Sequence, residues 1–182
     1  MQDLSLHILD IVENASAARA KRVDILVIEE PKENRLVIEI KDDGIGMDEE
    51  TSQKAIDPFF TTRASRRVGL GLSLMAQAAR EAGGTLRIES ELGKGTRVTA
   101  TFQYCHIDRK PLGSMVETMA TLLLGNPELD IFYTHKNEGK SYGLNSQGLK
   151  DRFKDRPLID PEVIQWLKTN LKEGLAQIGV QE

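Results

Sequence analysis

The chain has few of the features that mark secreted or membrane proteins. Its 182 residues include a single cysteine, Cys105, so no disulfide can form within the chain, which suits a reducing compartment. No second pair joins Cys105 and His106 at the spacing of a zinc site. No apolar run reaches the roughly 20 residues of a membrane span, and no basic segment opens a signal peptide. We therefore expect a cytoplasmic protein with no membrane partner.

Positive charge is not in excess either. The formal net charge is −4, which gives no general attraction to nucleic acid, so we expect no nucleic-acid partner. A basic cluster from Arg63 to Arg67 is a local exception. With 40% hydrophobic and 29% charged residues, the composition is that of an ordinary globular protein.

Hydrophobic periodicity over residues 1–104 predicts a helix, two strands, a loop-rich stretch, a second helix and two more strands. This order predicts an α+β fold, a two-layer α/β sandwich with one layer of helices and one sheet. The expected elements are a helix at 3–19, strands at 22–30 and 35–41, a helix at 73–82, and strands at 85–91 and 96–102.

Residues 105–182 differ in character and predict a small C-terminal αββα-like extension of unassigned role. Its final helix has clear punctuation, with Asp160 as N-cap, Pro161 at the first helical position and Gly179 past the end. The other expected elements are a short helix marked by Met115, Met119, Leu122 and Leu123, and a hairpin with strands at 130–135 and 140–144.

Four short blocks stand in a fixed order within the first hundred residues: Asp10–Asn14, Asp42–Gly46, Asp57–Arg63 and Gly69–Ser73. Each block alone is weak evidence, because short glycine-rich strings recur by chance. Together they describe the floor, wall, lid and phosphate end of one nucleotide pocket. ATP binding is therefore the leading hypothesis.

The first block offers two polar side chains on one face of a helix. Mg²⁺ keeps most of its waters and takes one or two protein ligands, and Asn14 could supply one. Asp10 lies one turn earlier, about 6 Å along the helix, where it could orient or deprotonate an attacking water or hydroxyl. The alternative is that both side chains only solvate an exposed face.

The second block suggests a base site. The Asp42 carboxylate could accept a hydrogen bond from the exocyclic amine of adenine, and Gly44 and Gly46 would let the backbone approach the flat base. Thr96 is expected near the base. The alternative is a tight Asp-Gly turn.

The last two blocks suggest a lid and a phosphate site. Backbone N–H groups at a helix start attract anions, and a loop with paired phenylalanines and arginines could close over phosphates. The alternatives are a solvated basic loop and a flexible loop before a helix. The residues expected to contact nucleotide are Phe60, Thr61, Thr62, Arg63, Gly69, Leu70, Gly71 and Leu72.

These blocks resemble those of the GHKL ATPase superfamily, which includes DNA gyrase, heat-shock chaperone ATPases, histidine kinases and mismatch-repair ATPases. The resemblance covers roughly residues 3 to 103, and the lid and phosphate blocks look most like the histidine-kinase catalytic domain. It implies the Bergerat ATP-binding fold, with Asn14 holding Mg²⁺ and Asp42 binding adenine. The tail resembles neither a transducer nor a receiver domain.

Three departures from the family pattern are visible. Asp10 stands where glutamate or asparagine is usual, and Arg67 replaces the first glycine of the lid motif. The chain starts at the helix of the first block, so we expect a stand-alone protein without a phospho-acceptor helix. His7 is expected to make a local polar contact.

The sequence thus predicts an Mg-ATP-binding protein of the histidine-kinase or GHKL ATPase type, a regulatory kinase or ATPase that acts on a partner protein. Catalysis would rest on Asp10 as the base and Arg63 on the phosphates. The alternative is a non-catalytic, ATP-gated protein-interaction switch, which the short side chain of Asp10 favours. An ATP-independent scaffold is the least favoured, because all four blocks keep their key residues. The oligomeric state is left open.

Overall fold

The protein forms one mixed sheet covered by helices. A computed structural model describes residues 3–57, 70–154 and 156–180, the side chain of Leu70 aside. The strands are β1 (Arg22–Glu30), β2 (Arg35–Asp42), β3 (Thr85–Glu91), β4 (Gly95–Gln103), β5 (Asp130–Asn137) and β6 (Lys140–Asn145), and the helices are α1 (Leu4–Ala17), α2 (Glu49–Lys54), α3 (Leu70–Glu81), α4 (Met115–Gly125), α5 (Ser146–Arg152) and α6 (Pro161–Gln177).

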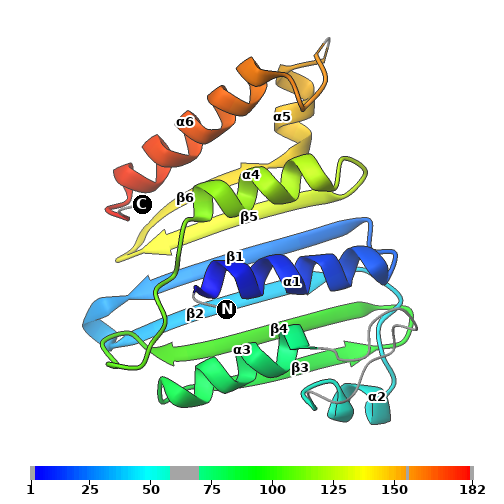
Figure 1. The fold of residues 1–182 in the computed structure, drawn as a ribbon, viewed down its shortest axis with the longest axis vertical. Helices are drawn as coiled ribbons and strands as arrows, with labels where there is room; N and C mark the ends of the chain where they lie inside the picture. Colours follow the sequence, from blue (N-terminus) through cyan, green and yellow to red (C-terminus); the bar gives the residue numbers. More distant parts are fainter. Residues whose placement is uncertain (1–2, 58–69, 155, 181–182) are drawn as a thin grey trace.

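The strand order is β3-β4-β2-β1-β5-β6. Helices α1, α3, α4 and α6 lie over one face of this sheet, and the described helices leave the other face open (Figure 1). The predicted α+β class and two-layer arrangement are confirmed.

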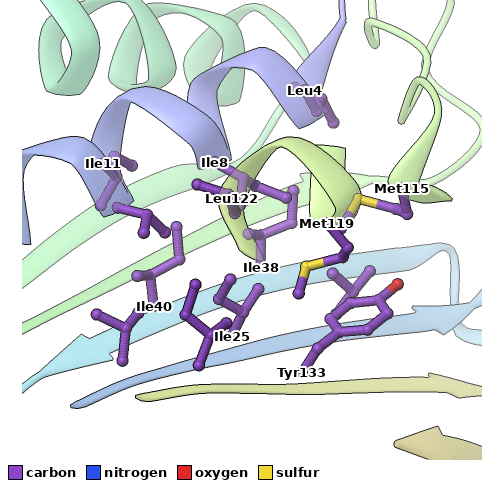
Figure 2. Packing of buried hydrophobic residues seen from close by; sticks show 14 of the residues in the cluster. Leu4, Ile8, Ile11, Ile25, Ile38, Ile40, Met115, Met119, Leu122 and Tyr133 are labelled. Carbon is purple, nitrogen blue, oxygen red and sulfur yellow. The ribbon is translucent and has the colours of Figure 1, made fainter. Parts of the chain in front are cut away.

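Alternation along the strands explains why only one face is covered. Val23, Ile25 and Val27 of β1 are buried, while the residues between them are more exposed. In the antiparallel register Ile25 lies opposite Ile40 and Val27 opposite Ile38, so both strands present their apolar side chains to the same face. Figure 2 shows this layer beneath the α1 side chains. Each such side chain contributes roughly 1.5–3 kcal/mol when fully buried.

The tail joins the same sheet. Its helix and hairpin are present as predicted, but β5 pairs with β1 in parallel, with Ile131 opposite Val23 and Tyr133 opposite Ile25. Helix α4 packs beside α1, and it also contacts α6. Its Met119 side chain lies over Tyr133 of β5 (Figure 2). The predicted αββα-like extension is therefore present, and its hairpin adds two strands to the sheet of residues 1–104. The predicted division into an ATP-binding domain at residues 1–104 and an extension at 105–182 stays a prediction.

Two short helices were not predicted. α2 begins after Asp48, whose side chain accepts a hydrogen bond from the Thr51 N–H at 2.8 Å, and α5 begins after Asn145, which accepts from the Gly148 N–H at 2.7 Å. Such caps satisfy free N–H groups at a helix start. α3 begins at Leu70, earlier than the predicted residue 73. Within the described ranges, none of the helices combines the length and the hydropathy that crossing a membrane requires.

The segment before α4 binds the start of α1. The backbone N–H groups of Leu4 and Ser5 donate to the carbonyl oxygens of Pro111 and Leu112 at 3.0 and 2.7 Å. These contacts satisfy donors that a helix start leaves free, in place of a side-chain cap from Asp3. The tail therefore fixes the end of the helix that carries the first sequence block.

The expectation that His7 makes a polar contact is wrong. Its side chain is fully buried, and neither ring nitrogen has a hydrogen-bond partner in the described parts of the chain. Burial, together with the positive charge of Lys110, lowers the pKa of His7 to about 4. The ring is therefore held neutral at physiological pH.

Candidate functional site

The start of α3 lies against the polar side chains of α1. A methyl group in place of the Gly71 hydrogen would lie 3.5 Å from Asp10 Oδ2 and 3.7 Å from Asn14 Nδ2. Asp10 and Asn14 are half-buried. Because glycine carries no side chain, the first turn of α3 can approach both groups closely. The structure thus brings together the predicted base, the predicted metal ligand and a helix start whose N–H groups favour anions.

The loop after β2 is tied to the end of the same helix. The Ile45 N–H donates to the carbonyl oxygen of Ala18 at 2.9 Å, directly after the last turn of α1. Gly44 is buried in this contact. Gly46 has φ +65°, and a side chain there would overlap the carbonyl oxygen of Glu91. The second block is therefore held between α1 and the β3–β4 turn.

Asp42 is a half-buried carboxylate whose direction is fixed. Its Oδ1 accepts a hydrogen bond from the Gly44 N–H at 2.8 Å. Burial raises the pKa of Asp42 above its ordinary value, although backbone N–H groups of Gly44 and Thr96 pull it partly back. Half-buried carboxylates with a raised pKa concentrate at functional sites, because the protein holds a charge there that it does not fully compensate.

Thr96 lies beside Asp42, since the two are directly opposite each other in the β2–β4 register. The Thr96 hydroxyl is 2.8 Å from the Ser90 hydroxyl on β3. Ser90 also accepts a hydrogen bond from the Met47 N–H at 2.8 Å. The predicted base-contacting residues Asp42, Gly44, Gly46 and Thr96 therefore form one connected group at the sheet end.

Some predicted contacts fall outside the described residues: Phe60, Thr61, Thr62, Arg63 and Gly69. Leu70 is described only as the first residue of α3, and Leu72 is half-buried and packs against the core. Their assignment as nucleotide ligands stays a prediction. The same holds for the ligand roles of the described site residues, which the structure gathers without a ligand.

Two residues of this region were missed in the sequence. Asp43 Oδ1 accepts from the N–H groups of Lys21 and Arg22, both at 2.8 Å, and so fixes the start of β1 to the end of β2. Ser90 joins the loop to β4. Asp43 stood within the second block, but Ser90 carries no local signal, because its partners are set by the register of β3 and β4.

Comparison with known proteins agrees with this geometry. The family model described as histidine kinase-, DNA gyrase B- and HSP90-like ATPase matches residues 2–105, more than half of the chain. The chain belongs to this family. The resemblance predicted from the four blocks is confirmed, and the protein carries an ATP-binding domain of the GHKL type.

Curated relatives within this family are sensor proteins and kinases. A putative sensor protein of Shewanella frigidimarina is 36% identical over 109 residues, which are 59% of this chain and 17% of that protein. Sporulation kinase E of Bacillus subtilis is 36% identical over 89 residues, 48% of this chain and 12% of that protein. The chain thus spans less than a fifth of the length of these relatives.

Two solved structures share the fold over a longer part of the chain. The MutL ATPase domain of Aquifex aeolicus, complexed with ADP, covers 85% of this chain and 68% of its own, with TM-score 0.53 and 20% identity. The N-terminal domain of a DNA repair protein covers 84% of this chain and 57% of its own, with TM-score 0.59 and 15% identity. These matches extend past residue 105 and therefore include part of the tail.

Proposed function

We propose that this protein binds Mg-ATP between α1, the loop after β2 and the start of α3, and acts on a partner protein as a regulatory kinase or ATPase. The observation that carries the proposal is the convergence at Gly71, where a helix start lies against both Asp10 and Asn14. A kinase-type activity is also supported by the relatives, which include sporulation kinase E and a putative sensor protein.

The adenine ring of the nucleotide would lie at Asp42 and Thr96. The Asp42 carboxylate is oriented by the hydrogen bond from the Gly44 N–H, and it would accept a hydrogen bond from the exocyclic amine of adenine. The Gly44–Gly46 backbone lets a flat ring approach, and the phosphates would extend toward Gly71 at the start of α3, where N–H groups and the helix dipole favour negative charge.

The residues present fit a magnesium ion bound with the nucleotide. Among the described residues no three His, Cys, Asp or Glu side chains gather as a metal cage. Mg²⁺ bound with a triphosphate needs none, because it takes one or two protein oxygens besides phosphate and water. The Asn14 amide oxygen would hold it, and the ion would neutralise phosphate charge.

Asp10 would act on the group that attacks the γ-phosphate. Its carboxylate lies beside the helix start at Gly71 and can hold an attacking water or hydroxyl, and accept its proton. Phosphoryl transfer needs little more than positioning and charge stabilisation from the protein. The acceptor is a residue of the partner protein or, for an ATPase, water.

Binding is tested by calorimetric titration with ATP and Mg²⁺, together with thermal melting in ATP, in ADP and in Mg²⁺ alone. We expect ATP to raise the melting temperature in a concentration-dependent way, since a ligand of the folded state alone stabilises it. Asp10→Asn should keep binding and lose turnover. A melting curve that ATP leaves in place, with no heat of binding, would remove the proposal.

An ATP-gated interaction switch is the second candidate. It is favoured by Asp10, whose side chain is one methylene shorter than the usual glutamate and reaches less far. Turnover by the wild type separates the two. If ATP binds but neither hydrolysis nor transfer is detected, and Asp10→Glu restores hydrolysis, the switch replaces the enzyme.

A further inference from the structure

Ser90 is a neighbour of Thr96 on the adjacent strand, and Thr96 is part of the proposed adenine site. The two residues are directly opposite each other on β3 and β4, on the face of the sheet that the helices cover. Three hydrogen-bonding groups surround the Ser90 hydroxyl. They are the Met47 N–H at 2.8 Å, the Gly95 carbonyl oxygen at 3.0 Å and the Thr96 hydroxyl at 2.8 Å.

The number of protons in this cluster determines which atom donates in each hydrogen bond. A serine hydroxyl has one proton to donate and two lone pairs that accept. The Gly95 carbonyl takes the proton of Ser90, because a carbonyl oxygen cannot donate. The Met47 N–H occupies one lone pair, because an amide nitrogen cannot accept. All three hydrogen bonds are kept only when the Thr96 hydroxyl donates its proton to the second lone pair of Ser90.

A Thr96 hydroxyl that donates to Ser90 has only lone pairs left for a ligand. The neighbouring carboxylate of Asp42, when ionised, is also only an acceptor. The proposed base site then presents hydrogen-bond acceptors from both side chains. Such a surface suits an amine and repels a carbonyl oxygen, directly or through a bridging water.

We propose that Ser90 is a positioning residue that orients the Thr96 hydroxyl and so makes the base site selective for a purine with an exocyclic amine. This inference rests on the proposed ATP site and adds a specificity determinant to it. Ser90 acts through Thr96 and through the Met47 N–H, which fixes the loop, and touches no nucleotide itself. Without Ser90, the Thr96 proton is free to turn toward the ligand, where it can donate to a carbonyl oxygen.

The test compares ATP with inosine triphosphate, which carries a carbonyl oxygen in place of the amine. Dissociation constants for both nucleotides with Mg²⁺ are measured by calorimetry on the full chain. We expect Ser90→Ala to lower the preference for ATP over inosine triphosphate about tenfold. Ser90→Thr, which keeps the hydroxyl, should retain a preference close to that of the wild type.

The same pair of strands provides a matched control. Thr85 and Thr101 are a second cross-strand hydroxyl pair on β3 and β4, 3.2 Å apart and on the open face of the sheet. Thr85→Val removes a hydroxyl from the same pair of strands, on the face of the sheet opposite to Ser90 and Thr96. Its nucleotide preference should equal that of the wild type.

A double-mutant cycle separates orientation from mere stability. Thr96→Val should change the preference by about as much as Ser90→Ala, and adding Ser90→Ala to it should change the preference little further. If Ser90→Ala does not fold, Thr96→Ser and Thr96→Val carry the test, because only the first keeps a hydroxyl beside Ser90. A preference unchanged in Thr96→Val then overturns the inference.

The outcomes distinguish this inference from the proposed function. If Ser90→Ala weakens both nucleotides by the same factor, Ser90 is only structural and the inference is overturned, while ATP binding stands. If the wild type binds neither nucleotide, the proposed function is removed and the selectivity of Ser90 with it.

Discussion

Two halves of the same sheet use their polar side chains in opposite ways. The nucleotide half, β1 to β4 with α1 and α3, keeps the half-buried carboxylate of Asp42 at a raised pKa. In the tail half, β5 and β6 with α4 to α6, pairs of polar side chains join one element to another. Lys168 of α6 donates to both carboxylate oxygens of Glu117 on α4 at 2.7 and 2.8 Å, and Tyr142 donates to Asn170 at 2.8 Å.

The boundary between the halves is itself closed by hydrogen bonds. Glu29 at the end of β1 lies 2.8 Å from His135 Nε2, and the Nδ1 of that ring lies 2.7 Å from the Tyr133 hydroxyl. An ionised Glu29 only accepts, so the proton of this hydrogen bond lies on Nε2 of His135. The tail half therefore braces the sheet, whereas the nucleotide half keeps a half-buried carboxylate, Asp42, whose burial is only partly offset by backbone hydrogen bonds.

The largest expected effect lies at His7, on α1 of the nucleotide half. The pKa of His7 is about 4 in the folded state against an ordinary value of 6.5, so the unfolded chain binds more protons between these two pH values. The free energy of unfolding is therefore highest above the pKa of His7 in the unfolded chain. It falls as the pH drops from 6.5 toward 4, by about 3 kcal/mol once the pH is below both pKa values. Denaturant unfolding at several pH values measures the loss.

His7→Leu removes this titration and should flatten the profile over that pH range. His106→Gln, at a partly exposed histidine, is the matched control for the loss of one histidine from the chain. A wild-type profile that is flat between pH 4 and pH 6.5 would contradict the buried neutral ring.

Asp42→Asn should separate binding from stability in the nucleotide half. We expect ATP affinity to fall roughly 30-fold, about 2 kcal/mol, because the amine loses a charged acceptor. Stability without nucleotide should hold or rise at neutral pH, since burial penalises the carboxylate there. Calorimetry and thermal melting measure the two effects. Asp24→Asn on the open face should change neither, and unchanged affinity in Asp42→Asn would be the contrary result.

Gly174→Ala should show the reverse pattern in the tail half. A methyl group at this position of α6 would overlap the ring of Tyr142. Overpacking should cost about 1.5 kcal/mol despite the better helix propensity of alanine. Gly125→Ala, at the end of α4 where a methyl group meets nothing within 4 Å, is the control. Urea unfolding gives the loss, and ATP affinity below the transition should stay at the wild-type value.

The smallest effect is expected for Glu29→Gln. Burial alone would raise the pKa of Glu29, but hydrogen bonds from His135 and Tyr104 and the charge of Arg109 lower it overall. Ionised Glu29 thus stabilises the fold at pH values above its pKa in the unfolded chain. This contribution is lost as the pH falls through its pKa in the folded chain. We expect a loss of about 1 kcal/mol at neutral pH. Glu30→Gln, in an exposed ion pair, should cost less; equal losses in urea titrations would contradict the contrast.

Local patterns gave correct predictions where a feature depends on neighbouring residues. The cap of α6 is an example, since Asp160 accepts from the Glu162 N–H at 2.8 Å and Pro161 starts the helix. The four blocks were likewise recognised, and the family they indicated is confirmed. The parallel pairing of β1 with β5 was not predicted, because alternation marks a strand and its buried face but not its neighbour in the sheet.

The sequence by itself determined the strand faces, the helix caps and the ATPase family, because each depends on residue type at short spacing. Only the tertiary structure decided that Gly71 lies against Asp10, that Ser90 lies behind Thr96, and that the tail extends the same sheet. These contacts join residues far apart in the chain, and they form only when strand register and helix packing bury one continuous apolar face.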